Sequence, residues 1–134
     1  MRGLNGYVFR MGNRGFADHV PEDCPPDSAT PAEGKVYRCI KRNGIQAEDF
    51  ETHFENDRRP DADLCSRCAL SVLRSLDEAR QFRKTMPKLG RYIAEAVLRP
   101  EHGMWKLTDK RSGHINWWPY DGVERTTLFQ LVQE

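Results

Sequence analysis

Cys65 and Cys68 have two residues between them, which is the spacing of one half of a tetrahedral zinc site. Zinc sites usually take a second close pair of ligands, but Cys24 and Cys39 are isolated from each other along the chain. Two interpretations follow. In the first, Cys24, Cys39, Cys65 and Cys68 hold a structural zinc ion, with His53 as a substitute ligand. In the second, Cys39 and Cys68 are small buried hydrophobic residues and Cys24 is an exposed thiol.

Ser71 is the polar residue of an apolar run, ALSVL, at positions 69–73. Leu70 and Val72 alternate with the other side chains of this run, and the alternation predicts a buried strand. The Ser71 hydroxyl either contributes to a binding or reactive site or forms a hydrogen bond with nearby backbone.

Trp117 and Trp118 lie in the sequence HINWWPYDG. Consecutive side chains of a strand point to opposite faces, so one ring is expected in the core. The other ring packs against another element or lines a cleft, where it would stack on a flat ring such as a nucleobase or nicotinamide. His114 opens this strand, and a role as general base would require a partner that the sequence does not reveal.

Local patterns predict the elements that hold these residues. Residues 36–40 (VYRCI) form a short strand with Val36, Arg38 and Ile40 on one face. Residues 47–56 form a helix, and residues 69–73 form the next strand. Ser75 and Glu78 form a capping box that starts a second helix at Leu76, which ends at Pro87. Residues 91–98 form a strand, and residues 104–107 and 114–118 form a hairpin. The tail, residues 125–132, is either a last strand or a short helix, and a strand is predicted.

This order predicts an α+β domain over residues 35–134. Its parts are a small, mostly antiparallel sheet, continuous or split, two helices and a C-terminal aromatic hairpin. Residues 1–34 are rich in proline and glycine and are expected to be an N-terminal extension, partly disordered or docked on the domain.

The composition of the chain indicates which classes of binding partner are not expected. The chain has 134 residues, with 21 Lys and Arg against 20 Asp and Glu, so its formal net charge is +1. This near balance is not the charge signature of a dedicated nucleic-acid-binding protein. The short basic run Lys106, Lys110 and Arg111 is interpreted as a solvated turn. No apolar run approaches the roughly 18 residues that span a bilayer, so no membrane partner is expected. Cysteines without an export signal favour a reducing compartment, and a cytoplasmic location is predicted.

The order of elements over about residues 36–98 resembles the ADP-ribosyltransferase superfamily, whose small α+β domains bind NAD in a cleft of a split antiparallel sheet. The resemblance implies that Arg38, with its neighbour Tyr37, contacts the dinucleotide from the first strand. It implies that Ser71 helps to shape the site and that a late glutamate supports transfer from the nicotinamide ribose. Glu124 is the best-placed acid, with Glu95 and Asp121 as alternatives. The implied cofactor-binding residues are Arg38, Tyr37, Trp117, Trp118 and His114, and the implied catalytic residues are Ser71 and Glu124.

Two functions are therefore predicted. The first is an NAD-binding ADP-ribosyl transfer domain that acts on a protein or nucleic acid. The alternative is a non-catalytic binding or regulatory module, with or without a structural zinc ion.

Overall fold

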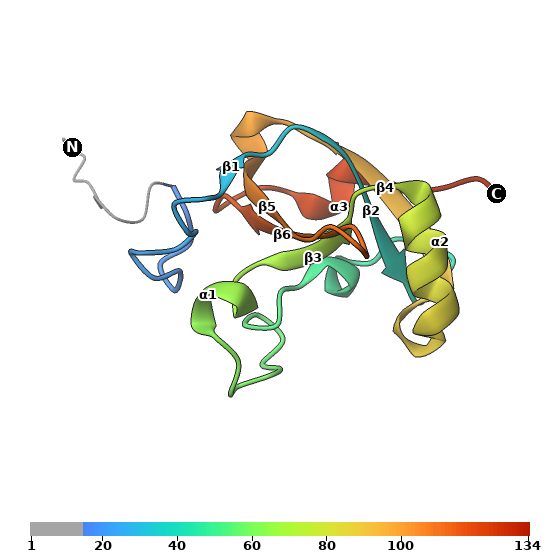
Figure 1. The fold of residues 1–134 in the computed structure, drawn as a ribbon, viewed down its shortest axis with the longest axis horizontal. Helices are drawn as coiled ribbons and strands as arrows, with labels where there is room; N and C mark the ends of the chain where they lie inside the picture. Colours follow the sequence, from blue (N-terminus) through green and yellow to red (C-terminus); the bar gives the residue numbers. More distant parts are fainter. Residues whose placement is uncertain (1–14) are drawn as a thin grey trace.

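The computed structural model describes residues 15–134, which form one seven-stranded sheet with short helices packed against it (Figure 1). The order of strands across the sheet is β1-β5-β6-β3-β2-β4-β7, and every pairing is antiparallel. The strands are β1 (Thr30–Pro31), β2 (Gly34–Ile40), β3 (Leu70–Leu73), β4 (Tyr92–Leu98), β5 (Gly103–Asp109), β6 (His114–Pro119) and β7 (Phe129–Leu131). The α-helices are α1 (Leu64–Arg67), α2 (Leu76–Thr85) and α3 (Arg125–Leu128), and the 3-10 helices are η1 (Ala47–Phe50), η2 (Pro87–Leu89) and η3 (Pro100–His102).

The sheet curls around its main core. Trp117 of β6 and Phe129 of β7 are separated by three strands in the sheet order, so in a flat sheet they would lie about 19 Å apart. Their ring centroids are instead 6.3 Å apart. The concave face between them is filled by apolar side chains of all the long strands and by Phe50 of η1, which stacks on Phe129 at 4.4 Å.

The convex face is covered in two separate places. The helix α2 packs over β2, β3 and β4, where Ala79 meets Tyr37, Leu73 and Ile93. The segment 16–29, together with α1, covers Trp118 and forms a second cluster. Figure 1 shows α1 and α2 at opposite ends of the sheet. The middle of the convex face, on β3, β6 and β5, lies between these two coverings.

The predicted α+β fold with a mostly antiparallel sheet is confirmed, and the sheet is continuous. The predicted strands 36–40, 69–73 and 91–98 correspond to β2, β3 and β4, and the aromatic hairpin corresponds to β5 and β6. The capping residue of α2 is also confirmed, since the Ser75 side chain accepts a hydrogen bond from the Glu78 backbone N–H. The tail contains both of the structures weighed for it, first α3 and then β7.

The predicted helix over residues 47–56 is wrong. Only Ala47–Phe50 is helical, as a 3-10 turn, and Thr52 and Glu55 then close a separate turn through reciprocal backbone-to-side-chain hydrogen bonds. The four-residue spacing of Phe50 and Phe54 does not mark one helical face. Phe50 enters the concave core, whereas Phe54 stacks on His19 at 4.2 Å in the convex cluster.

The part of the N-terminal extension that the structure describes is packed on the domain. Phe16, Val20 and Cys24 are buried, and β1 adds an edge strand to β5. No helix within residues 15–134 has the length and apolarity needed to cross a bilayer.

Candidate functional site

Five polar side chains gather in the uncovered middle of the convex face, and we call them the polar patch. They are Ser71 of β3, His114 and Asn116 of β6, and Lys106 and Thr108 of β5. Ser71 lies directly opposite Asn116, and Asn116 lies directly opposite Lys106. Because directly paired residues point to the same face, these three side chains form a row across the strands.

His114 links the strands of the patch. Its Nε2 lies 3.0 Å from the Ser71 hydroxyl oxygen, and its Nδ1 lies 2.5 Å from the Thr108 hydroxyl oxygen. Burial lowers the pKa of His114 below its ordinary value, and the nearby Asp109 carboxylate opposes this effect. The imidazole is therefore held neutral between two hydroxyl groups.

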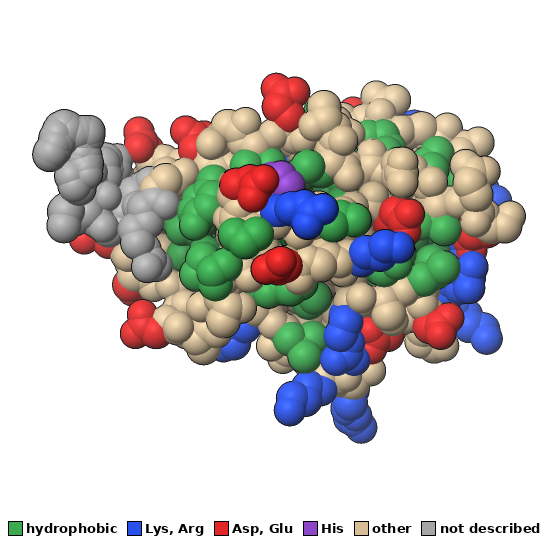
Figure 2. Space-filling view, turned by 90° about the horizontal axis from the view of Figure 1, so that it is seen from above, with side chains coloured by type: hydrophobic (Ala, Val, Ile, Leu, Met, Phe, Trp, Pro, Cys, Tyr) green, Lys and Arg blue, Asp and Glu red, His purple; other side chains and the backbone are tan. Residues whose placement is uncertain are grey.

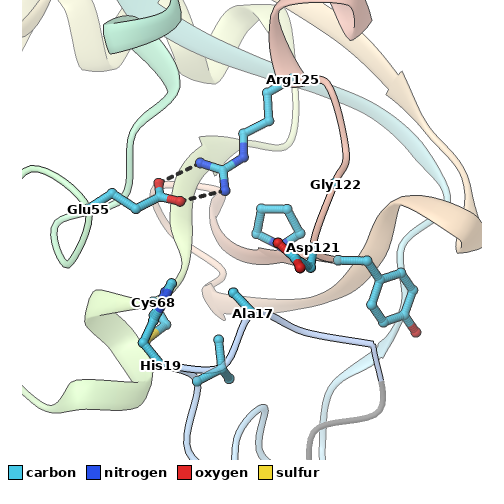
Figure 3. A pocket seen from close by; sticks show the side chains of 10 residues that line it. Ala17, His19, Glu55, Cys68, Asp121, Gly122 and Arg125 are labelled. Carbon is cyan, nitrogen blue, oxygen red and sulfur yellow. Dashed lines mark hydrogen bonds and ion pairs between the residues drawn. The ribbon is translucent and has the colours of Figure 1, made fainter. Parts of the chain in front are cut away.

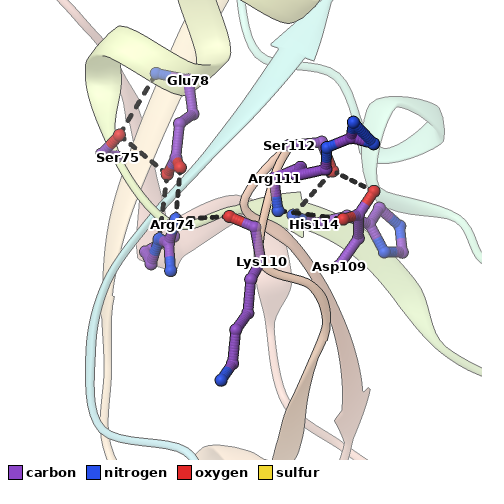
Figure 4. Close-up of polar contacts among 8 residues, drawn as sticks. All are labelled: Arg74, Ser75, Glu78, Asp109, Lys110, Arg111, Ser112 and His114. Carbon is purple, nitrogen blue, oxygen red and sulfur yellow. Dashed lines mark hydrogen bonds and ion pairs between the residues drawn. The ribbon is translucent and has the colours of Figure 1, made fainter.

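The β5–β6 turn holds His114 in this position (Figure 4). Asp109 accepts hydrogen bonds from the Arg111 backbone N–H and the Ser112 hydroxyl, and these lower the pKa of the Asp109 carboxyl. Gly113 has φ of +78°, and a Cβ atom there would meet the Glu78 carboxylate at 2.3 Å. Arg74 binds that carboxylate and also donates to the Lys110 carbonyl oxygen, which ties the turn to the start of α2.

An open groove of about 500 Å³ begins beside the patch. Strands β5 and β6 contribute Lys106, Thr108, Asn116 and Trp118 to its lining. The segment around Asp23 and the start of α1 contribute the rest, including Asp63, whose carboxylate accepts hydrogen bonds from Ser66. The groove is therefore lined by one cation and two carboxylates. Its size is in the range of sites that hold small molecules.

A second, much smaller pocket of about 50 Å³ lies beside the Glu55–Arg125 ion pair (Figure 3). Arg125 donates to both carboxylate oxygens of Glu55 and to the Phe50 carbonyl oxygen. Although burial acts to raise the pKa of Glu55, the hydrogen bonds from Arg125 and Thr52 hold it below its ordinary value. The Glu55 and Arg125 charges are paired with each other and the pocket is small, so the polar patch and its groove are the better candidate site.

Arg38 and Ser71 point to opposite faces of the sheet. Arg38 shares the concave face with Val36 and Ile40, whereas the pairing of Tyr37 with Leu73 places the Ser71 hydroxyl on the convex face. The Arg38 guanidinium donates to the Asp49 carbonyl oxygen and to the Ser71 backbone carbonyl oxygen, each at 2.7 Å. Burial lowers the pKa of Arg38 to about 10. Its donors hold η1 against β3, which is a structural role.

Replacing Arg38 by alanine is expected to lower the free energy of unfolding by about 2–3 kcal/mol, because two carbonyl oxygens lose a charged donor. Urea denaturation at pH 7 measures this loss. Arg42→Ala is the matched control, since the Arg42 side chain is 56% exposed and its partner Glu48 is also exposed. That control should change stability by less than about 0.5 kcal/mol. Equal stability of the two variants would contradict the structural role of Arg38.

The other predicted cofactor-binding and catalytic residues are dispersed. Tyr37 is buried beneath α2. Trp117 is 0% exposed in the concave core and Trp118 is 2% exposed in the convex cluster, so neither presents a face for stacking. Glu124 is an exposed residue at the start of α3, and no contact joins it to Ser71 within residues 15–134. Of the seven predicted residues, Ser71 and His114 are the two whose side-chain polar groups meet.

The four cysteines do not form one cluster. Cys24 and Cys65 form a disulfide, whereas Cys39 lies under α2, where its thiol donates to the Ala79 carbonyl oxygen. Cys68 is a buried free thiol near the disulfide, and burial raises its pKa to about 11. The described residues contain no group of three or more His, Cys, Asp or Glu side chains arranged to hold a metal ion. The four predicted zinc ligands are thus not brought together, and the expected exposed thiol at Cys24 is a buried half-cystine.

Three residues of the patch carry no strong local signal. Lys106 belongs to the basic run interpreted as a solvated turn, but it lies on β5 and lines the groove, while Lys110 and Arg111 are in the exposed turn. Thr108 and Asn116 are ordinary strand residues in the sequence. Their alternation with Leu107 and Ile115 places them on the outer face, but only the strand order brings them to Ser71.

The surface charge agrees with the balanced composition. On the face shown in Figure 2, acidic and basic side chains both occur, with hydrophobic side chains between them. Comparison of the chain with protein-family models, with curated proteins and with solved structures finds no match.

Proposed function

We propose that this protein is a nucleotide-binding domain whose ligand occupies the groove beside the polar patch, with NAD as the ligand indicated by the family resemblance. The observation that carries the proposal is the groove itself: Lys106, Asp23 and Asp63 all line one space of about 500 Å³. Such a groove is complementary to a ligand that carries both a negative and a positive charge. NAD is one, since it combines an anionic pyrophosphate with a cationic nicotinamide ring.

The side chains of the patch fit the polar groups of such a ligand. The Lys106 ammonium is a suitable partner for a phosphate oxygen, and within the described chain it has no ion-pair partner. The Asn116 amide and the Thr108 hydroxyl also line the groove and suit ribose hydroxyl groups. Trp118 lines the groove but is only 2% exposed, so the proposal does not include ring stacking.

The proposal is limited to binding. Transfer of ADP-ribose would need a carboxylate beside the reacting ribose, and Glu124 lies outside the patch. Arg38 is also outside it, with its guanidinium donating to two backbone oxygens. The proposed function therefore combines the NAD site of the first predicted function with the binding role of the second, without ADP-ribosyl transfer.

Isothermal titration with NAD tests the proposal. We expect saturable binding to the wild type and a loss of about tenfold in affinity for Lys106→Ala, the loss that corresponds to about 1.4 kcal/mol. Lys88→Ala is the matched control, because Lys88 is an exposed residue of η2 away from the groove, and it should bind like the wild type. ADP-ribose and ADP, titrated in parallel, show whether the nicotinamide contributes. Absence of NAD binding at millimolar concentration, or equal affinity of the two lysine variants, would refute the proposal.

A further inference from the structure

The two hydrogen bonds of the Thr108 hydroxyl favour one tautomer of His114. Thr108 has one hydroxyl proton, and its oxygen lies 3.2 Å from the His114 backbone oxygen and 2.5 Å from Nδ1. A carbonyl oxygen can only accept, so the Thr108 proton is donated to it. The other contact is then satisfied only if Nδ1 carries a hydrogen and donates it to the Thr108 oxygen. A neutral imidazole carries one such hydrogen, so Nε2 has a free lone pair.

That lone pair faces the hydroxyl of Ser71 at 3.0 Å. A serine hydroxyl, a histidine nitrogen able to accept its proton, and a third group that fixes the histidine ring are the parts of an activated nucleophile. Here the third group is a threonine hydroxyl instead of a carboxylate. The contact cannot be recognised from a local sequence motif, because Ser71 and His114 are 43 residues apart.

The surroundings keep His114 in its neutral, proton-accepting form. Burial lowers its pKa below the ordinary value of 6.5, against the attraction of Asp109. Its register partner on β3 is the uncharged Leu73, and Thr108 on β5 is uncharged. On the α2 side, Glu78 lies beside Gly113 but is paired with Arg74. On the neighbouring strand β5, Lys106 is the charged residue of the polar patch.

The same row of the sheet supplies groups that can stabilise a developing negative charge. Asn116 is directly opposite Ser71, and Lys106 is directly opposite Asn116. In residues 15–134 neither the Asn116 amide nor the Lys106 ammonium has a protein partner for its hydrogens. Asn116 is thus one strand away from the nucleophile and the longer Lys106 side chain two strands away. Donors near a nucleophile are the usual means of stabilising the oxyanion of acyl transfer.

We propose that Ser71 is a nucleophile that accepts an acyl group from an activated ester, with His114 as its general base. In this step the Ser71 Oγ forms a bond to the carbonyl carbon of the ester. The hydroxyl proton moves to His114 Nε2, the carbonyl electrons move to an oxyanion near Asn116 and Lys106, and the ester's alkoxide leaves as the tetrahedral intermediate collapses. The leaving group takes the proton from His114, so atoms and charge balance. This activity goes beyond nucleotide binding and does not depend on it.

The test uses a fluorophosphonate probe, which forms a phosphonyl ester with an activated serine and releases fluoride. Mass spectrometry of the labelled full-length protein is expected to show one adduct, located at Ser71. His114→Gln should slow labelling by about 10²–10⁴-fold, the contribution of a general base. Ser28→Ala is the matched control, because Ser28 is exposed and outside the patch, and it should be labelled like the wild type.

A pH profile separates general-base action from a structural effect. Only neutral His114 accepts the proton, so the labelling rate should fall as the pH drops through a pKa below 6.5 and should be level above it. Thermal unfolding of each variant confirms that it is folded. The proposal is overturned if no adduct forms at Ser71 or if folded His114→Gln reacts at the wild-type rate. NAD titration of the same samples is a separate readout, so labelling and nucleotide binding can fail independently.

Discussion

Trp117→Ala is expected to lower the free energy of unfolding by about 3–5 kcal/mol, the range found for removing a large aromatic side chain from a core. The Trp117 side chain is 0% exposed and lies at the centre of the concave cluster. Its ring packs near Phe129 across the curl of the sheet, and its indole N–H donates to the His102 carbonyl oxygen at 3.1 Å. The substitution removes both the packing between distant strands and this hydrogen bond.

Urea denaturation at pH 7, followed by circular dichroism, measures the effect. Trp105→Ala is the matched control, because Trp105 is in the adjacent strand, directly opposite Trp117, but is only half-buried. It should cost clearly less stability than Trp117→Ala. A loss at Trp117 as small as that at Trp105 would contradict the place assigned to Trp117 at the centre of the core.

Removing the Cys24–Cys65 disulfide is expected to lower the free energy of unfolding by about 4 kcal/mol. The two cysteines are 41 residues apart in the sequence, and closing a loop of that length restricts the unfolded chain by about this amount. The bond also joins the N-terminal segment to α1 over Trp118, so its removal loosens one wall of the groove.

The double variant Cys24→Ser/Cys65→Ser, compared with the wild type under non-reducing conditions, measures this contribution. Cys39→Ser is the matched control, because Cys39 is a half-buried free thiol under α2. Addition of a reductant should destabilise the wild type toward the double variant and leave the double variant unchanged. If the reductant does not affect the wild type in denaturant, the predicted disulfide contribution is wrong.

Much of the fold follows from local patterns. The alternation around Leu70 and Val72 predicts a strand, and Ser75 with Glu78 predicts the start of α2, because both signals depend on residues within one turn or one pleat of each other. The same reasoning fails for residues 47–56. There the spacing of Phe50 and Phe54 imitates a helical face, but the two rings pack into different clusters.

The sequence predicts individual residues of the candidate site but not the contacts between them. Ser71 and His114 stand out individually as a polar residue in an apolar strand and a histidine at the start of an aromatic strand. Their contact depends on β3 and β6 being neighbours. Thr108, which favours one tautomer of His114, is placed by a register shift between Leu107 and Asp109 that the sequence does not mark.

The sequence by itself determined the α+β class, the strands that carry Ser71 and His114, and the burial of at least one tryptophan. It also placed Arg38 on the same face as Val36 and Ile40, since alternation along a strand is a local property. Only the tertiary structure decided which strands are neighbours and in which register. The pairing of Tyr37 with Leu73 separates Arg38 from the Ser71 hydroxyl, and the pairing of Leu73 with His114 brings that hydroxyl to an imidazole. Register is set by contacts between residues far apart in the chain, so it moves a side chain from one face to the other without any change in the local pattern.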